Sequence, residues 1–337
     1  QNASHFCMTN KNNNDSLEET LARITAAINA GHYNDAFRLY SEVFSLWPEY
    51  LSPATSVPLT KSQATHIHNV GNLARRDLFV KTQSIGSSDR IKRAVAIFCG
   101  AEQKQFDKAL QSPSFLYVPN LPSAPFSDVN SVKGLNAYVA ALSEYKGVFI
   151  SRLSQANEPY IHDTGDVPNT KEWAQLALKW NSLHLMKGGE LTKHGRQLPE
   201  EIKALFDSPI LAHCPVHAPE VVISVLQPNT KIPPHFGISN IKWTLHIPLI
   251  INDKSYLNVA NEKVFWREGK TAILFDDSYQ HSAENGADTA RAVLIMDVWN
   301  PHLTLDERAD ITQFISAYSE WSSQYGALAT LDKRLYA

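Results

Sequence analysis

The feature that most constrains the fold is a series of short segments rich in β-branched and aromatic residues, which begins near residue 219. The segments are EVVISVLQ, KWTLHIPLII, YLNVA, KVFWREG, TAILF and ARAVLIMDVW, and turn-forming sequences such as PNT, NDK, NE and GK separate them. Several short strands at regular spacing are typical of antiparallel sandwiches and barrels. We therefore predict a sandwich or a jelly-roll barrel for this part of the chain.

The residues before this region favour helices. Ser16-Leu-Glu-Glu19 matches a capping box, in which a serine and a glutamate three residues later satisfy the first backbone N–H groups of a helix. Gly31 provides a turn, and Pro48 provides a stop after the second helix. The further predicted helices cover about residues 34–46, 62–84 and 89–111.

A helix, a glycine turn, a second helix and a closing proline resemble one tetratricopeptide (TPR) unit, and a small helical domain with an ordinary core fits the same residues. We therefore predict a helical, TPR-like domain over residues 16–111, which could contact a protein partner. The polar residues 1–15 are expected to be disordered.

The composition changes near residue 112. SPSFLYVPNLPSAPFSD is rich in proline and serine and is interpreted as a linker or an entry loop. EWAQLALKW (172–180) is interpreted as a candidate strand because its apolar residues partly alternate. HLTLDERADITQFISAY predicts one or two closing helices, and shorter helices are expected near 130–145 and 198–208. Residues 112–337 are thereby predicted to form a second domain.

Composition narrows the class of protein. The net charge is −3 and no long basic run occurs, which argues against nucleic-acid binding. No apolar run reaches the roughly 18 residues of a membrane span. The 3 cysteines are widely spaced and favour free thiols over a disulfide framework. These observations predict a cytoplasmic protein.

Two of the 13 histidines stand out because each lies in a polar segment beside a strand-like run. His235 follows two prolines that stiffen the backbone, and His281 follows TAILF. Two such histidines facing each other across the mouth of a barrel could hold a metal, and imidazole suits iron, zinc, copper and nickel. A lone histidine in a β segment is more often an ordinary hydrogen-bonded group, so the pattern alone leaves the metal open.

Arg291 opens the last predicted strand, ten residues after His281. A guanidinium group can bind a carboxylate through two parallel hydrogen bonds. An arginine at a strand start is usually a surface ion pair. Together, however, a metal and a buried arginine fit a small dicarboxylate that chelates the metal with one end, and 2-oxoglutarate is such a molecule.

Residues 223–303 resemble the catalytic domain of the aspartyl/asparaginyl β-hydroxylase family of iron(II)- and 2-oxoglutarate-dependent oxygenases. The motifs that carry the resemblance are ISVLQPNTKIPPHFGISN, LHIPLII, FDDSYQHSAEN and ARAVLIMDVWNPHLT. The weaker FLYVPNLPSAPFSD and EWAQLAL extend it to about residues 112–310. The resemblance implies an α+β protein with a double-stranded β-helix, the cupin-like form of the jelly roll, behind the helical domain.

The resemblance also implies roles for individual residues. His235 and His281 match the iron ligands, and Arg291 matches the residue that binds the distal carboxylate of 2-oxoglutarate. Ser224 matches a hydroxyl group bonded to this cosubstrate, and His246 matches a histidine near its metal-binding end.

Two positions qualify the implied function. Many iron sites have a carboxylate ligand two residues after the first histidine, whereas this family has a glycine there and water completes the coordination. Gly237 is the corresponding residue in this chain. The family often reads Asn-x-Arg-x-Arg-x-His, and this chain has Asn240-Ile-Lys242-Trp-Thr244-Leu-His246. Those arginines are associated with acidic groups of the substrate, so we expect a different amino acid, a peptide or a carrier-bound acyl group. Lys242, Trp180 and His184 are predicted to line the substrate site.

The implied reaction is hydroxylation of an unactivated C–H bond by dioxygen, with conversion of 2-oxoglutarate to succinate and carbon dioxide. Three alternatives remain open. They are a 2-oxoglutarate-dependent halogenase with chloride in the place that Gly237 leaves, a non-catalytic helical-repeat adaptor with a degenerate barrel, and a zinc-dependent jelly-roll hydrolase or isomerase.

Three aspartates near these motifs have open roles. Asp276 and Asp277 either orient His281 from a second layer around the metal or serve as turn residues. Asp297 lies in an apolar strand and needs a partner if it is buried, so we predict a structural salt bridge.

Overall fold

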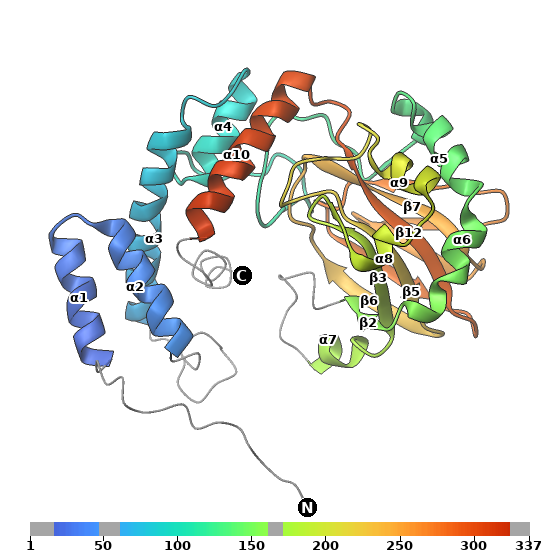
Figure 1. Ribbon diagram of the computed structural model, residues 1–337, viewed down its shortest axis with the longest axis horizontal. Coiled ribbons are helices and arrows are strands. Elements are labelled where there is room, and N and C mark those ends of the chain that lie inside the picture. The colour runs from blue at the N-terminus through green and yellow to red at the C-terminus, as the bar shows by residue number, and fades with distance from the viewer. Residues whose placement is uncertain (1–16, 47–60, 161–170, 324–337) are drawn as a thin grey trace, which may run out of the picture. The chain divides into compact units, whose positions relative to one another are not determined.

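The computed structural model describes residues 17–46, 61–160 and 171–323 (Figure 1). The chain divides into two compact units. The helical unit comprises residues Gln1–Lys81 and Glu320–Ala337, and the barrel unit comprises Thr82–Ser319.

The helical unit contains α1 (Leu17–Asn29), α2 (Tyr33–Leu46) and α3 (Lys61–Thr82). Gly31 has a φ of +76°, the left-handed conformation that glycine adopts easily, and it makes the turn between α1 and α2. The helices predicted near 34–46 and 62–84 are therefore confirmed, whereas residues 1–15, Ser16 of the capping box and Pro48 lie outside the described residues.

The barrel unit is built on two antiparallel sheets. The larger sheet has the order β1 (Phe126–Ser127), β10 (Ile273–Phe275), β7 (Lys242–Ile250), β12 (Arg291–Trp299), β5 (Val221–Leu226), β3 (Trp180–Lys187) and β2 (Glu158–Pro159), with β4 (Glu190–Leu191) beside β3. The smaller sheet has the order β6 (Thr230–His235), β11 (His281–Asn285), β8 (Ser255–Val259) and β9 (Glu262–Phe265).

From β5 to β12 the chain passes back and forth between the two sheets, with the β8–β9 hairpin in the smaller one. This exchange between two facing antiparallel sheets is the jelly-roll, or double-stranded β-helix, topology. The predicted fold is confirmed, as is its α+β character.

Helices cover the outer face of the larger sheet. They include α5 (Leu135–Ser143), α6 (Lys146–Ser151) and α9 (Glu200–Phe206), which lie along the sheet in Figure 1. Their apolar side chains form one core with alternate residues of the strands. Further short helical segments among the described residues of the barrel unit are η2 (Val129–Ser131), η3 (Leu153–Gln155), α7 (Lys171–Leu176) and α8 (Lys193–Arg196).

Alternation along β12 decides which side chains point between the sheets. Leu294 and Met296 belong to the core under the helices, whereas Val293 and Ile295 belong to a second core formed by residues of both sheets. Arg291 and Asp297 share the inward register of Val293 and Ile295. The same alternation turns three residues of β7 and one of β5 inward, and these are Lys242, Thr244, His246 and Ser224.

The structure corrects two sequence expectations. EWAQLALKW is not a strand over its first part, because α7 buries Trp173 and Leu176 at helical spacing, and β3 begins only at Trp180. The helix predicted over 89–111 ends at Phe98, since Gly100 adopts a left-handed φ of +77° just past the helix end.

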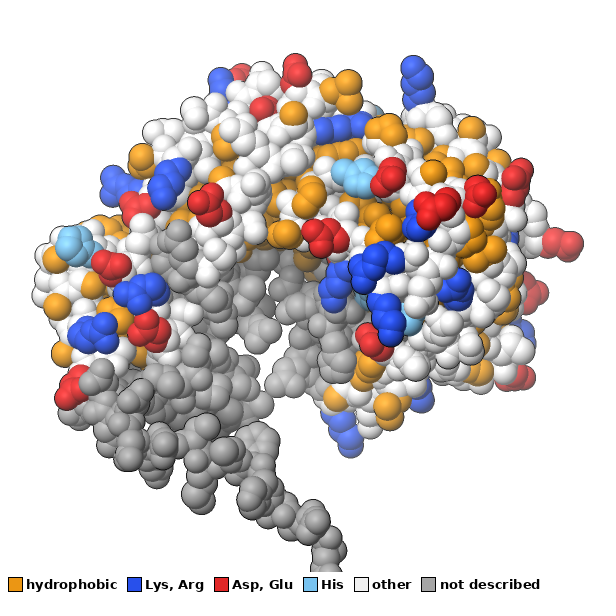
Figure 2. Space-filling view, in the orientation of Figure 1, with side chains coloured by type: hydrophobic (Ala, Val, Ile, Leu, Met, Phe, Trp, Pro, Cys, Tyr) orange, Lys and Arg blue, Asp and Glu red, His pale blue; other side chains and the backbone are white. Residues whose placement is uncertain are grey.

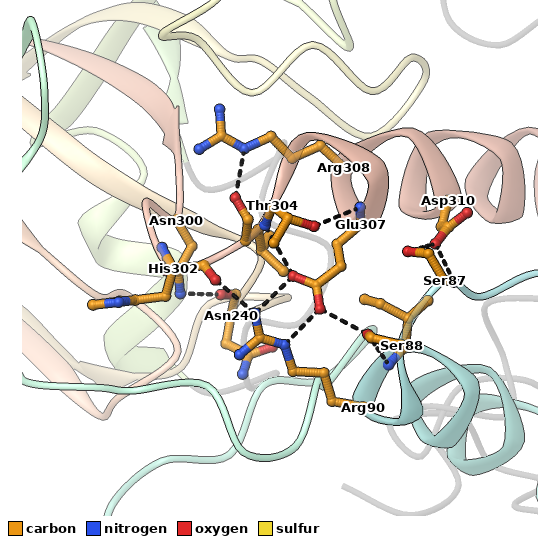
Figure 3. A network of polar contacts seen from close by, with 12 residues as sticks. Ser87, Ser88, Arg90, Asn240, Asn300, His302, Thr304, Glu307, Arg308 and Asp310 are labelled. Carbon is orange, nitrogen blue, oxygen red and sulfur yellow. Dashed lines mark hydrogen bonds and ion pairs between the residues drawn. The ribbon is translucent and has the colours of Figure 1, made fainter.

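A polar network joins α4 (Asp89–Phe98) and α10 (Leu305–Ser323) within the barrel unit (Figure 3). The buried Glu307 carboxylate accepts hydrogen bonds from Nε and Nη2 of Arg90, at 2.8 and 2.7 Å. It also accepts bonds from the Ser88 hydroxyl at 2.7 Å and from the Thr304 backbone N–H at 2.9 Å. The Glu307 side chain thereby fixes the start of both helices.

On the face seen in Figure 2, acidic and basic side chains lie side by side. Among the helices that the structure describes, none has both the length and the apolar character needed to span a membrane.

Candidate active site

Two histidines meet at the edge of the smaller sheet. His235 ends β6, His281 begins β11, and the two residues are directly paired in the register of these strands. Their ring centroids are 4.1 Å apart. With normal metal–nitrogen bonds of about 2.1 Å, two imidazoles bound at roughly a right angle have centroids about 4–5 Å apart. The pair is therefore spaced to share one metal ion.

Backbone carbonyls orient both rings. Nδ1 of His235 donates a hydrogen bond to the carbonyl oxygen of Pro233, and Nδ1 of His281 donates one to that of Tyr279, each at 2.8 Å. Each carbonyl belongs to the residue two positions earlier. A carbonyl only accepts, so the proton lies on Nδ1 and the lone pair on Nε2, which is the arrangement of a metal-binding histidine.

The surroundings keep these imidazoles neutral, as a metal ligand must be. Burial, reinforced by the proximity of His281, lowers the pKa of His235 to about 3. Burial also lowers the pKa of His281 to about 4.

Arg291 lies on the inward side of β12 and is only 4% exposed. Its Nη1 atom is buried and has no hydrogen-bond partner in the described part of the chain. Burial lowers the pKa of Arg291 to about 10, so the group stays charged at neutral pH. Because a buried charge without a partner is costly, this guanidinium group is a strong candidate to receive an anionic ligand.

Ser224 lies on β5, the strand next to that of Arg291, and Trp180 lies on β3, the strand beyond it. Ser224 pairs with Val293 of β12, and its hydroxyl oxygen accepts a hydrogen bond from Nε1 of Trp180 at 3.0 Å. Both residues are buried. The serine hydroxyl keeps its own proton to donate to a ligand.

His246 is buried and lies edge-on to the Phe275 ring, with centroids 5.1 Å apart. Burial, followed by the positive charge of Arg291 and the proximity of His281, lowers its pKa well below the usual value. His246 is therefore a neutral group near both Arg291 and the histidine pair.

The carboxylate of Asp277 fills the space beside Gly237. A Cβ atom on Gly237 would lie 2.5 Å from Cγ of Asp277 and 2.6 Å from its Oδ1. The backbone N–H of Gly237 donates to the Asp277 carbonyl at 2.6 Å, and Oδ1 is buried with no hydrogen-bond partner among the described residues. A carboxylate thus stands beside the position two residues after His235, although it comes from another segment.

Lys242 binds two carboxylates from the inward face of β7. Its Nζ donates to Oδ1 of Asp297 at 2.8 Å and to Oδ2 of Asp277 at 3.2 Å. The predicted salt bridge of Asp297 is therefore confirmed. Burial alone would lower the pKa of Lys242, but the attraction of the two carboxylates outweighs it and raises the pKa above its usual value.

The other residues near the site have specific partners. Nε2 of His184 lies 3.7 Å from Oε2 of Glu220. Asp276 is a turn residue, since it accepts hydrogen bonds from the backbone N–H and the hydroxyl of Ser278, and burial raises its pKa to about 7. The roles of His184, Trp180 and Lys242 in substrate binding stay predictions.

Two aromatic residues of the site were not expected from the sequence, and they are Trp173 beside His235 and Tyr160 beside Trp180. Trp173 lies edge-on to the His235 ring at 5.6 Å between centroids, and Tyr160 stacks on Trp180 at 4.3 Å. The only available signal was their aromatic character upstream of the strands, and it does not indicate a contact with a residue some 60 positions later in the chain.

In the part of the chain that the structure describes, no group of three or more His, Cys, Asp or Glu side chains is arranged to hold a metal ion. A metal held by His235 and His281 would therefore take its other ligands from water or from a chelating small molecule.

Comparisons with known proteins agree with these features. The family model for aspartyl/asparaginyl beta-hydroxylase matches residues 143–301. The human aspartyl/asparaginyl beta-hydroxylase is 29% identical over 174 residues, which are 51% of this chain and 20% of the relative. The ornithine lipid ester-linked acyl 2-hydroxylase of Rhizobium tropici is 34% identical over 123 residues, which are 32% of this chain and 43% of the relative.

Aspartate beta-hydroxylase domain-containing protein 2 of Xenopus tropicalis is 26% identical over 208 residues, which are 59% of this chain and 54% of the relative. The chain thus spans less than two thirds of the length of each of these three relatives. The range that the family model matches includes both histidines of the pair. Through the domain that contains residues 143–301, the chain is thus similar to the aspartyl/asparaginyl beta-hydroxylase family.

Proposed function

We propose that this protein is an iron(II)- and 2-oxoglutarate-dependent dioxygenase that hydroxylates an unactivated C–H bond of an amino acid, a peptide or a carrier-bound substrate. The observation that carries the proposal is the buried Arg291 guanidinium group, whose Nη1 has no partner among the described residues, near a histidine pair spaced for one metal ion.

His235 and His281 would hold iron(II) through their Nε2 atoms, since both Nδ1 atoms are engaged with backbone carbonyls. Imidazole is a good ligand for this metal. When bound, the metal and 2-oxoglutarate supply the oxidation, in which dioxygen, 2-oxoglutarate and the C–H bond are converted to succinate, carbon dioxide and an alcohol.

The chain's own residues would bind and orient the cosubstrate. Arg291 would bind the distal carboxylate with two parallel N–H donors, which fixes both position and direction. Ser224 would donate its hydroxyl proton to the same end. His246 would lie along the cosubstrate as a neutral polar group, because its low pKa prevents it from adding a second positive charge.

The position of Asp277 favours a hydroxylase over a halogenase. A halogenase needs a place for chloride beside the metal, and the space next to Gly237 is the natural candidate. The Asp277 carboxylate fills that space, at 2.5–2.7 Å from a Cβ built on Gly237. Its negative charge would repel chloride, whereas it could accept a hydrogen bond from a water molecule.

The substrate is proposed only by class. Lys242, Trp180 and His184 are the predicted contacts, and the relatives include proteins named for an aspartyl or asparaginyl group and for a lipid acyl group. Protein contacts through the helical unit and a cytoplasmic location remain proposals.

The direct test is succinate formation from 2-oxoglutarate by the purified full chain with iron(II) and dioxygen, without added substrate. We expect slow iron-dependent turnover that His235→Ala and His281→Ala abolish and that Arg291→Gln weakens by raising the KM for 2-oxoglutarate. The exposed His32→Ala in the helical unit is the matched control and should leave turnover unchanged. Wild-type protein that forms no succinate, or forms it equally well without His281, would contradict the proposal.

A further inference from the structure

Asp277 is held by a series of hydrogen bonds between buried polar groups, which starts at the backbone. The backbone N–H of Glu220 donates to Oδ2 of Asp297 at 2.8 Å, and Oδ1 of Asp297 accepts a bond from Lys242. Lys242 then donates to Oδ2 of Asp277. The fixed backbone before β5 thereby determines where the Asp277 carboxylate lies.

Only one carboxylate oxygen of Asp277 takes part in this series of hydrogen bonds. Oδ2 is bound to Lys242, while Oδ1 is buried without a hydrogen-bond partner among the described residues. Both oxygens lie beside Gly237, two residues after His235, with Oδ1 at 2.6 Å and Oδ2 at 2.7 Å from a Cβ built on the glycine. An ionised carboxylate with one oxygen fixed and the other left open is arranged to receive a donor at the open oxygen.

We propose that Lys242 is a positioning residue, which holds the Asp277 carboxylate by its Oδ2 so that Oδ1 faces the ligand position of the metal bound by His235 and His281. The inference rests on the proposed metal site, and it assigns to Lys242 a role that does not require contact with the substrate.

Stability alone explains this arrangement poorly. A buried ion pair gains little over well-packed apolar residues of the same size, because taking the charges out of water costs about as much as their attraction returns. Lys242 and Asp297 are 5% and 4% exposed, and the structure still leaves an oxygen of Asp277 unsatisfied. Such an incomplete polar network points to a ligand that completes it.

The geometry also separates Lys242 from the other cation of the site. Arg291 lies at the first position of β12 and Asp297 near its last, so the two cations act at opposite ends of the inward face. Nη1 of Arg291 lacks a partner among the described residues, whereas Lys242 is neutralised by two carboxylates. Arg291, which would bind an added anion, and Lys242, which would position a carboxylate beside the metal, are thus distinct residues.

The test is a double-mutant cycle on metal affinity, measured by calorimetric titration of the full chain with Mn²⁺ in the absence of 2-oxoglutarate. Partners behind a metal site typically contribute about 10- to 100-fold in affinity, and we expect Lys242→Met to weaken Mn²⁺ binding by that amount. In an Asp277→Asn background, the same substitution should weaken it by no more than about twofold. Lys242→Arg, which keeps the charge, should recover part of the loss.

Equal weakening in both backgrounds would show that Lys242 acts through general structure and would overturn the inference, as would no weakening in either. Circular dichroism of each variant checks folding. If Lys242→Met does not fold, Asp297→Asn replaces it in the cycle, because it releases the anchor and keeps the lysine. Its effect should again be confined to the background that retains Asp277, and an equal effect in both would overturn the inference.

His281→Ala distinguishes the two proposals. If this variant still binds Mn²⁺ as wild type does, the proposed metal site fails and the role of Lys242 fails with it. If His281→Ala abolishes binding and the cycle shows no coupling, only the role of Lys242 fails.

Discussion

Replacing Gly237 with alanine tests whether the Asp277 carboxylate lies where the structure has it. The new Cβ would lie 2.5, 2.6 and 2.7 Å from Cγ, Oδ1 and Oδ2 of Asp277, whereas ordinary contacts begin at 3.4 Å. The carboxylate would have to move by 0.7 to 0.9 Å, from 3.4 − 2.7 and 3.4 − 2.5. Such a shift strains its 3.2 Å ion pair with Lys242.

Forcing an extra methyl group into packed structure typically costs about 1–3 kcal/mol of unfolding free energy, and we expect Gly237→Ala to destabilise the protein by this amount in urea unfolding. In an Asp277→Ala background the three atoms nearest to the new Cβ are gone, so the cost should fall below about 0.5 kcal/mol. Gly147→Ala in α6 is the matched control, because nothing lies within 4 Å of its Cβ. It should be neutral or stabilising by up to about 1 kcal/mol.

Two results would refute this reasoning. One is Gly237→Ala with wild-type stability, which would mean that Asp277 lies elsewhere. The other is the same cost in the Asp277→Ala background, which would assign the strain to another neighbour.

Three further predictions concern Arg291, Thr244 and Glu307. Arg291→Gln should raise the KM for 2-oxoglutarate in the succinate assay by about 10- to 100-fold, because a buried charge-assisted contact is lost; an unchanged KM would remove Arg291 from the cosubstrate site. Thr244→Val should raise the unfolding free energy by about 1 kcal/mol, since the buried hydroxyl has no partner among the described residues; a loss of stability would reveal a hydrogen bond. Hydrogen bonds from Arg90 lower the pKa of Glu307 from 4.5 to about 2. This fall in pKa corresponds to about 3 kcal/mol of unfolding free energy. Because Arg90 is partly exposed, solvent screening reduces the contribution to about 2 kcal/mol. The stability advantage of wild type over Glu307→Gln should therefore be fully present above pH 4.5 and disappear as the pH falls towards 2; a pH-independent difference in urea unfolding would contradict this assignment.

The sequence predicts the strands that are rich in β-branched and aromatic residues, and it misses several others, among them the two that carry the histidines. β5, β7, β8, β9, β10 and β12 follow from runs of β-branched and aromatic residues. β6 contains Pro233 and Pro234, and β11 reads HSAEN, so neither has strand propensity. β6 is an edge strand, where proline is tolerated because a missing N–H breaks no ladder there. Pairing between the strands, and not local preference, makes these segments extended.

The residues of the candidate site also differ in how far the sequence predicts them. The positions of His235, His281 and Arg291 are indicated by their motifs, and the structure brings the two histidines together. The environment of Lys242 could not be predicted, because its partners Asp277 and Asp297 lie 35 and 55 residues away in the sequence. A lysine at a strand start carries no signal of burial until the sheet order is known.

The central claim is that His235 and His281 together seat an iron(II) ion that a 2-oxo acid chelates. An anaerobic titration of the iron(II)-loaded chain with 2-oxoglutarate, followed by the visible charge-transfer band of the chelate, tests it most directly. We predict a saturable band at one equivalent of iron, absent in His235→Ala and in His281→Ala. No band in the wild type, or an equal band in either variant, would contradict the claim.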